Sequence, residues 1–172
     1  YNLVDDSGYV TNLDHIPDRI ISLAPSTTEV VFALGLDEKV VGVSEYCDYP
    51  YDFKEWFAAG NMTSIGDFSS PNMEVITSLE PDLILSTAGV QAEFVGTLRN
   101  LGYKVLVLNP TSINGVLQNI ELVGNATGKV AEAKTLIDNI SSRISAVVDK
   151  VANQPDKPTV YYEVWYDASS LW

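Results

Sequence analysis

The chain has 172 residues, 46% of them hydrophobic, which is typical of a folded domain rather than a disordered segment. Its net charge of −13 argues against a nucleic-acid partner, because phosphate binding needs clustered Lys and Arg. No apolar run approaches the ~18 residues that a membrane-spanning helix requires. One cysteine and one histidine exclude an intrachain disulfide and a Cys/His zinc cluster.

The negative charge is concentrated in the first part of the chain. Residues 1–100 hold 16 acidic and 4 basic residues, whereas residues 101–172 hold 7 and 6. Such a charge could serve solubility or recognition of a basic partner, and composition alone leaves both interpretations open.

From the N-terminus, residues 1–18 predict a hairpin of two short strands that turns at Asp6-Ser7-Gly8. Short apolar segments then alternate with segments of helical periodicity. The expected strands cover residues 20–23, 40–43, 83–85 and 105–108, and the expected helices cover residues 26–34, 72–79 and 91–101. This alternation indicates the α/β class, with a parallel sheet covered by helices on both faces.

After Pro110 the pattern becomes helical. One helix is expected over residues 113–123, an Asn-Ala-Thr-Gly break follows at 125–128, and a long helix is expected from Lys129 to Asn153. A strand is expected over residues 159–166. The predicted organisation is an N-terminal α/β lobe (1–110), a helical segment with a long bridging helix (111–155), and the first strand of a C-terminal lobe that the chain lacks (156–172).

The loop after the short strand expected at residues 20–23 contains Pro25, Ser26 and Thr27. Ser26 and Glu29 have the spacing of a capping box, in which each side chain binds a free backbone N–H at a helix start. This loop also follows the carboxyl end of a strand, where α/β sheets bind ligands. A cap alone and a cap with ligand contact are both consistent with the sequence.

Two segments are rich in aromatic residues: residues 46–57 hold six of the 17 aromatics and residues 161–172 hold five. In the first, the rings are interleaved with Asp, Pro, Lys and Glu, which favours a loop that presents rings to a flat ligand or a protein. The alternative is a loop pinned by its own aromatics. Self-association of the chain through the two segments is a further expectation.

A third feature is the sequence Ser70-Pro71-Asn72-Met73-Glu74. Asn72 is a favourable N-cap, and the helix dipole favours a carboxylate such as Glu74 in the first turn. This structural explanation is sufficient unless a partner requires the carboxylate.

Several motifs together resemble the substrate-binding proteins of ABC importers for vitamin B12 and for iron–siderophore or haem chelates. The resemblance covers residues 5–165, and the motifs are RIISLAPSTTE (19–29), GVS (42–44), YCDYP (46–50), GDF (66–68), SPNME (70–74) and EPDLIL (80–85). It implies two α/β lobes joined by a rigid helix, with the chelate between them. It also implies an extracytoplasmic protein, in the periplasm or anchored at the cell surface, that is exported with removal of a signal and delivers its ligand to permease subunits.

The resemblance assigns roles to individual residues. Glu74 matches a glutamate that docks onto arginines of the permease, and Tyr46 matches an aromatic that packs on the corrin ring. Phe68 lies where some members place a Trp near the ligand, and Thr87 lies where B12 binders carry an aromatic. The predicted ligand site consists of Pro25, Ser26, Thr27, Tyr46, Phe68 and Thr87, with Glu74 reserved for the permease, and a corrinoid (cobalamin or cobinamide) is the favoured ligand.

The chain is expected to be a binding protein rather than an enzyme, with no catalytic residue, resident cofactor or metal ligand. Cys47 is expected to be a bystander. A ferric siderophore or haem is the alternative ligand. A small doubly wound enzyme or nucleotide-binding domain, or a surface adhesion domain, are the alternatives of another class, although Gly124–Lys129 lacks the spacing of a phosphate loop.

Overall fold

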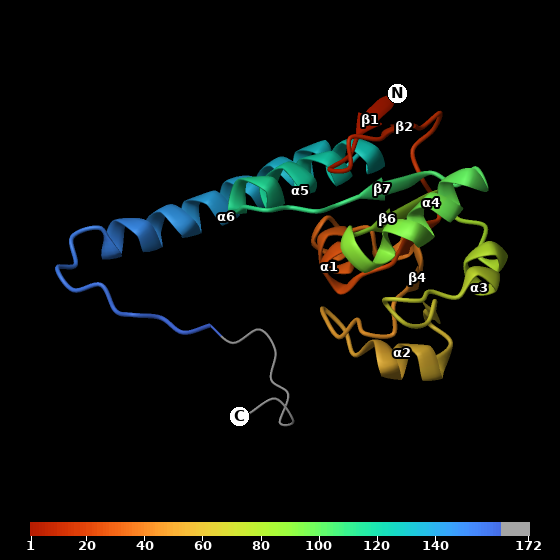
Figure 1. Cartoon of the computed structure of the whole chain (residues 1–172), viewed down its shortest axis with the longest axis horizontal. Helices are drawn as coiled ribbons and strands as arrows, with labels where there is room; N and C mark the ends of the chain where they lie inside the picture. The colour runs from red at the N-terminus through yellow and green to blue at the C-terminus, as the bar shows by residue number, and fades with distance from the viewer. Residues whose placement is uncertain (163–172) are drawn as a thin grey trace. The chain divides into compact units, whose positions relative to one another are not determined.

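A five-stranded parallel sheet is the centre of the computed structural model, which describes residues 1–162 (Figure 1). Its strands are β3 (Ile20–Ser22), β4 (Val40–Val43), β5 (Thr63–Ser64), β6 (Leu83–Ser86) and β7 (Val105–Val107). They pair in the order β5-β4-β3-β6-β7, and every pair is parallel. The α/β prediction is confirmed. Only β5 was not predicted, because a two-residue strand has no recognisable apolar pattern.

Helices flank the sheet, as expected. The helical elements that precede α6 in the chain are α1 (Pro25–Ala33), α2 (Phe53–Ala59), α3 (Met73–Ser78), α4 (Ala92–Asn100), α5 (Ile113–Thr127) and the short 3₁₀ turns η1 (Asp37–Lys39) and η2 (Gly89–Gln91). Apolar residues of α3 and α4 share a buried core with the strands, which includes Ile21, Ile76, Ile84, Val95 and Leu98. Helix α1 contacts β3, β4 and α5.

The predicted N-terminal hairpin is present as a separate two-stranded sheet of β1 (Asn2–Val4) and β2 (Val10–Asn12). Its turn includes Gly8, whose φ of 77° suits glycine. The buried Asp5 carboxylate fixes the hairpin to the main sheet: it accepts the Val107 N–H at 2.9 Å and pairs with Arg99 at 2.5 Å. The sequence analysis did not single out this ion pair.

Helix α5 ends at Gly128, which is left-handed with φ 73°, and α6 (Val130–Val151) follows. The predicted long helix is therefore confirmed, with α6 ending two residues before Asn153, whereas the break is shorter than predicted: residues 125–127 belong to α5, and only Gly128 and Lys129 separate the two helices. The two helices pack closely at Gly124, where an added Cβ would lie 2.5 Å from the Ala133 Cβ. None of the described helices is long and apolar enough to cross a membrane.

The described chain divides into two units, the first from Tyr1 to Asn139 and the second beginning at Ile140. This boundary lies within α6, and the predicted division of the chain at residues 110 and 155 stays a prediction. The described part of the second unit consists of the end of α6 followed by residues 152–162 without regular structure. The strand expected at 159–166 is absent over residues 159–162, because no strand of the described chain pairs with it, and its remainder lies outside the described residues.

Candidate functional site

The candidate site lies where the strands end at their carboxyl edge. From the central β3 the chain moves to β4 and β5 on one side and then returns to β6 and β7 on the other. The loops after β3 and β6 therefore diverge at a topological switch point, where open α/β sheets bind their ligands. The loops after β4 and β5 reach the same edge.

The loop after β3 differs from its prediction. Helix α1 starts two residues earlier than a Ser26 cap requires: Ala24 is the N-cap, no side chain caps the helix, and Pro25 occupies the first turn. The capping-box prediction is therefore wrong, because proline's fixed φ already suits the first helical position. Ser26 is left exposed at the start of α1.

Thr27 is placed in the interior rather than at the surface. Its side chain is 1% exposed, and its hydroxyl lies 2.6 Å from the Ser22 Oγ and donates to the Ala24 carbonyl at 2.9 Å. Thr28 makes similar bonds to the same two residues. These hydroxyls join the end of β3 to α1, and they hold Pro25 and Ser26 at the surface.

Tyr46 is the most prominent exposed ring of the site. The residue is 57% exposed, and its phenol O–H donates to the Asp67 Oδ2 at 2.9 Å. This hydrogen bond raises the pKa of Tyr46, so the phenol remains protonated. Hydrogen bonds from Ser69 and from Tyr46 lower the pKa of Asp67, which remains a carboxylate at neutral pH. The bond joins the loops after β4 and β5.

Two hollows adjoin this ring. The first, which we call the Phe68 hollow, has a volume of about 380 Å³ and is lined by Pro25, Tyr46, Asp67, Phe68 and Ser69. It brings together Pro25, Tyr46 and Phe68, three of the residues that the sequence analysis assigned to the ligand. Its walls combine a proline and two aromatic rings, which suits the flat apolar face of a ligand.

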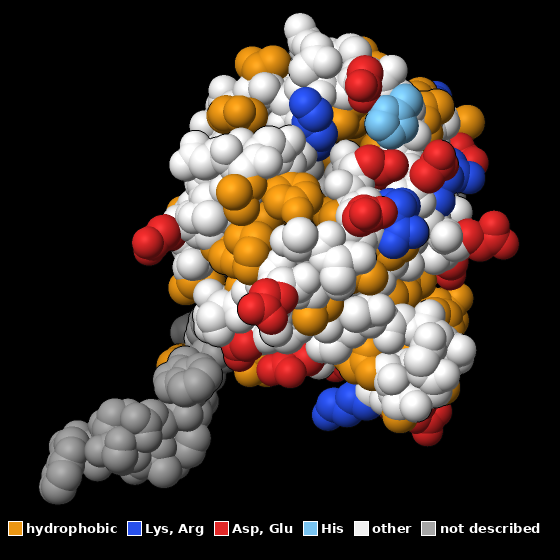
Figure 2. Space-filling model, turned by 90° about the vertical axis from the view of Figure 1, so that its right-hand side faces the viewer, with side chains coloured by type: hydrophobic (Ala, Val, Ile, Leu, Met, Phe, Trp, Pro, Cys, Tyr) orange, Lys and Arg blue, Asp and Glu red, His pale blue; other side chains and the backbone are white. Residues whose placement is uncertain are grey.

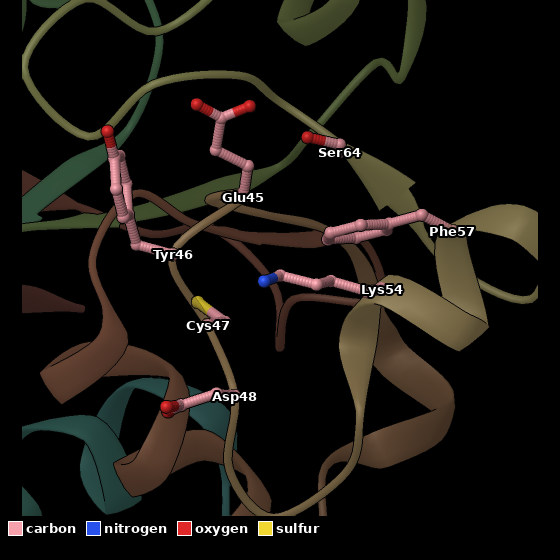
Figure 3. A pocket seen from close by; sticks show the side chains of 7 residues that line it. All are labelled: Glu45, Tyr46, Cys47, Asp48, Lys54, Phe57 and Ser64. Carbon is pink, nitrogen blue, oxygen red and sulfur yellow. The ribbon is translucent and has the colours of Figure 1, made fainter.

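The second, which we call the Lys54 hollow, has a volume of about 640 Å³ and shares Tyr46 with the first (Figure 3). It is lined by Glu45, Tyr46, Cys47, Asp48, Lys54, Phe57 and Ser64. Lys54 extends from α2 with its nitrogen directed toward the segment that carries Glu45 and Tyr46 (Figure 3). This hollow carries charges of both signs, in contrast to the Phe68 hollow.

Gln91 holds these loops together, and the sequence analysis did not identify it. Its side chain is completely buried. The amide nitrogen donates to the carbonyls of Leu23 and Phe68, both at 2.8 Å, and the amide oxygen accepts the Thr87 N–H at 3.0 Å. Thr87, a predicted site residue, lies half-buried at this edge but lines neither hollow. A lone glutamine at the start of a helix has no sequence signal for such a role.

The aromatic segment 46–57 serves two purposes. Tyr51 stacks on Trp56 with 4.3 Å between ring centroids, and Phe53 makes edge contacts with both and with Phe32 of α1. This part of the segment is pinned by its own aromatics, as the alternative interpretation expected. Tyr46 and Phe57 instead line the hollows. In the second aromatic segment, Tyr161 and Tyr162 are exposed, and Trp165, Tyr166 and Trp172 lie outside the described residues.

Cys47 lines the Lys54 hollow but is almost completely buried. Its sulfur lies 3.2 Å from the Thr28 hydroxyl oxygen, and burial raises the pKa of the thiol. Within residues 1–162, no group of three or more His, Cys, Asp and Glu side chains is arranged to hold a metal ion.

Glu74 is exposed in the first turn of α3, which starts at the same sheet edge as the hollows. The Asn72 side chain accepts the backbone N–H groups of Glu74 and Val75 at 3.0 and 3.2 Å, so the N-cap prediction is confirmed. Within the described chain, no ion pair occupies the Glu74 carboxylate.

At the opposite, amino edge of the sheet several charged groups pair with each other. His15 lies near Asp14 and Asp82, and the Asp82 carboxylate also accepts the backbone N–H groups of Asp18 and Arg19. Figure 2 shows the histidine, in pale blue, beside acidic side chains. The pairing at this edge contrasts with the open charges around the hollows.

A parallel α/β lobe with two hollows beside its switch point has the architecture of a small-molecule binding protein. Residues 20–171 match the model of the family described as "Periplasmic binding protein", and the chain belongs to that family.

Three known proteins illustrate the relationship. An uncharacterized ABC transporter substrate-binding lipoprotein, YvrC of Bacillus subtilis, is 32% identical over 93% of this chain and 51% of its own length. The periplasmic vitamin B12 binding protein BtuF of Vibrio cholerae superimposes with a TM-score of 0.68 at 30% identity, over 80% of this chain and 52% of that one. A possible iron-binding periplasmic solute-binding protein of Staphylococcus epidermidis superimposes with a TM-score of 0.72 at 29% identity, over 83% and 55%.

The chain spans about half the length of the curated relatives that it matches.

Proposed function

We propose that this chain forms one ligand-binding lobe of the substrate-binding component of an ABC importer, which captures a metal chelate and delivers it to permease subunits. Membership of the periplasmic binding protein family supports the binding role, and the name of the Bacillus relative supports the link to an ABC transporter. The proposed role is binding without catalysis.

The observation that carries the proposal is the Phe68 hollow. Pro25, Tyr46 and Phe68 come from three different loops and line one concave surface at the carboxyl edge of the sheet. A planar chelate has a large apolar face, and aromatic and proline side chains bind such a face without requiring charge. Ser26, exposed beside Pro25, is available for a polar contact with the ligand, whereas Thr27 is buried and Thr87 lines neither hollow.

We infer a corrinoid as the preferred ligand, and a ferric siderophore or haem is the alternative. The likeness to the vitamin B12 binding protein of Vibrio cholerae supports the corrinoid, and the similar likeness to a possible iron-binding protein supports the alternative. The exposed ring of Tyr46, held by Asp67, presents a fixed aromatic face, which supports a flat macrocycle, corrin or haem, over a siderophore.

Glu74 is the proposed contact with the permease. Its carboxylate is exposed on the rim of the site, and within residues 1–162 no cation pairs with it. A charge-assisted bond to an arginine of the permease would be stronger than a neutral hydrogen bond. The excess of acidic residues in residues 1–100 would steer the lobe toward a basic membrane partner.

The proposed location is outside the cytoplasm, in the periplasm or anchored at the cell surface, after export and removal of a signal. The names of the relatives, a lipoprotein in one case and periplasmic proteins in the others, support this location.

The test is a titration of the protein encoded by the complete gene with cobalamin, cobinamide, haem and a ferric siderophore, monitored by tryptophan fluorescence and by calorimetry. Saturable binding of a corrinoid, and its loss in Tyr46→Ala, is the expected result. Binding of haem or the siderophore alone would replace the corrinoid by the alternative ligand. Failure to bind any chelate would refute the function.

Self-association is a separate proposal, supported by the exposed apolar residues at the C-terminal end of the described chain: Val147, Val148, Val151, Tyr161 and Tyr162. Sedimentation of the 172-residue chain over a range of concentrations tests it. A single monomeric species at all concentrations would contradict it.

A further inference from the structure

The Lys54 hollow contains the one basic side chain of residues 1–100 that has no partner in the described chain. The other three are engaged: Arg19 donates to the Leu79 carbonyl, Lys39 pairs with Asp18, and Arg99 pairs with Asp5. Lys54 uses its backbone N–H at the start of α2, while its ammonium projects into the hollow (Figure 3). This ammonium is therefore available to a ligand.

The opposite charge is present in the same hollow and is also free. Glu45 and Asp48 line it, yet within residues 1–162 neither carboxylate forms an ion pair with Lys54. Groups of opposite charge that line one hollow without touching leave room for a polar group between them. That group must accept a hydrogen bond on one side and donate one on the other, because an ammonium only donates and a carboxylate only accepts.

The charge balance selects the chemistry of this group. Glu45, Asp48 and Lys54 together carry one net negative charge. A carboxylate of the ligand would approach two protein carboxylates, and a cationic substituent would approach Lys54. A neutral primary carboxamide avoids both conflicts, because its carbonyl oxygen accepts from the ammonium while its NH₂ donates to a carboxylate.

The position of the hollow fits a substituent on the edge of a flat ligand. Tyr46 lines both the Lys54 hollow and the Phe68 hollow, so the two adjoin across one ring. A planar chelate with its face over the Phe68 hollow would extend its rim past Tyr46 toward Lys54. Phe57 and the half-buried Ser64 line the rest of this second hollow and supply an apolar wall and a hydroxyl.

We propose that the Lys54 hollow binds a neutral primary carboxamide on the rim of the chelate, with Lys54 donating to its oxygen and Glu45 accepting from its nitrogen. This inference rests on the proposed function and makes it more specific. A corrinoid, whose ring carries amide side chains, satisfies the hollow. A haem or a siderophore edged by carboxylates does not.

The test compares two corrinoids that share the ring and differ at the rim: dicyanocobinamide, which carries amides, and dicyanocobyrinic acid, which carries carboxylates. Calorimetry with the protein encoded by the complete gene is expected to show a preference for cobinamide of about tenfold or more, because a like charge and an unmade charged hydrogen bond oppose the acid. Lys54→Met is expected to weaken cobinamide binding by about tenfold.

Glu45→Gln isolates the charge, since glutamine keeps an acceptor oxygen at this position. In this variant the affinity for dicyanocobyrinic acid is expected to rise by about fivefold, while the affinity for cobinamide changes by less than about threefold. The preference for cobinamide over the acid therefore becomes smaller. Lys104→Met and Glu80→Gln are the matched controls, because both residues are exposed and precede strands at the amino edge. They are expected to bind both ligands as the wild type does.

The outcomes separate this inference from the function on which it rests. Equal binding of the two corrinoids, or unchanged binding in both Lys54→Met and Glu45→Gln, would overturn the carboxamide site while leaving corrinoid capture intact. Absence of any corrinoid binding, with haem or a ferric siderophore bound instead, would overturn the corrinoid assignment and this inference together.

Discussion

The phenol of Tyr46 donates a 2.9 Å hydrogen bond to the Asp67 carboxylate, and this bond holds an exposed aromatic ring between two hollows. Tyr46 follows β4 and Asp67 follows β5, so the contact also joins neighbouring loops at the carboxyl edge of the sheet. The position of the ring is thus determined by two loops rather than one. Several consequences of this arrangement are measurable.

Replacement of Tyr46 separates the contribution of its ring from that of its hydroxyl. Tyr46→Ala is expected to weaken chelate binding by about 10- to 100-fold, because the main aromatic wall of both hollows is removed. Tyr46→Phe is expected to weaken it by about two- to tenfold, since only the bond to Asp67 is lost. Tyr49→Ala is the control: Tyr49 is 64% exposed and lines neither hollow. Calorimetry measures all three, and an equal loss in Tyr49→Ala would contradict the assignment.

Glu74→Ala is expected to leave chelate affinity unchanged and to reduce uptake. The carboxylate is exposed, lines neither hollow, and contributes to its own helix only through the dipole, an effect of about 0.3–1 kcal/mol. Glu93→Ala, an exposed acidic residue in the first turn of α4, is the matched control and should support normal uptake. Uptake in cells and calorimetry on the purified protein provide the two readouts. A parallel loss of affinity and uptake would show that Glu74 acts on the ligand rather than on the permease.

Gln91→Leu tests the buried hydrogen bonds that hold the loops of the site together. The substitution leaves the carbonyls of Leu23 and Phe68 and the N–H of Thr87 without their buried partner. It is expected to lower the free energy of unfolding by about 3 kcal/mol, measured by urea denaturation. Gln118→Leu, at an exposed position of α5, should change it by less than about 0.5 kcal/mol. Similar values for the two variants would mean that the loops do not depend on Gln91.

Two glycines in helices are expected to respond to alanine with opposite signs. At Gly124 a Cβ would lie 2.5 Å from the Ala133 Cβ, so Gly124→Ala should lower the free energy of unfolding by about 1–3 kcal/mol through overpacking of α5 against α6. At Gly96, within α4, a Cβ meets nothing within 4 Å. Gly96→Ala should raise stability by about 0.5–1 kcal/mol, because alanine restricts the unfolded chain. Urea denaturation measures both: unchanged or raised stability in Gly124→Ala would contradict close packing of α5 against α6, and destabilisation by Gly96→Ala would contradict the open space at that position.

His15 predicts a dependence of stability on pH. Hydrogen bonds to Asp14 and then to Asp82 raise the pKa of this histidine, so the folded state retains its proton to a higher pH than the unfolded state does. The stabilisation is therefore complete below the ordinary pKa of about 6.5 and is lost as pH rises through the higher folded-state pKa. The difference in unfolding free energy between the wild type and His15→Gln should be larger at pH 5.5 than at pH 9. A difference that grows with pH would contradict this sign.

The sequence predicted most of the sheet and its helices because the strands are continuous apolar runs and the helices have clear ends. Ile20–Ser22 and Leu83–Ser86 are buried throughout, and their runs of Ile and Leu predict buried strands. β5 was missed because two polar residues, Thr63 and Ser64, join the sheet through their backbones alone. Ser26 does not cap α1 because the helix already begins at Pro25. The sequence alone does not show which of these two residues starts the first turn.

The site was predictable only in part, for a similar reason. Pro25, Tyr46 and Phe68 follow strand ends, and the structure brings them to one hollow. Thr27 follows the same strand but is buried, because in the first turn of α1 its side chain faces the end of β3 and its hydroxyl lies 2.6 Å from the Ser22 Oγ. Gln91 has four hydrogen-bond partners, and two of them, Leu23 and Phe68, are distant in sequence, so the network exists only after the loops have folded together.

The stack of Tyr51 on Trp56 has a thermodynamic consequence for capture of a ligand. Together with Phe32 and Phe53, this stack anchors the far end of the segment that follows β4. The backbone between β4 and Tyr51 is therefore restrained at both of its ends. A preset frame of this kind loses little conformational entropy when a ligand arrives. Association would then be limited mainly by the rate at which the ligand reaches the open edge of the sheet, rather than by rearrangement of the loop.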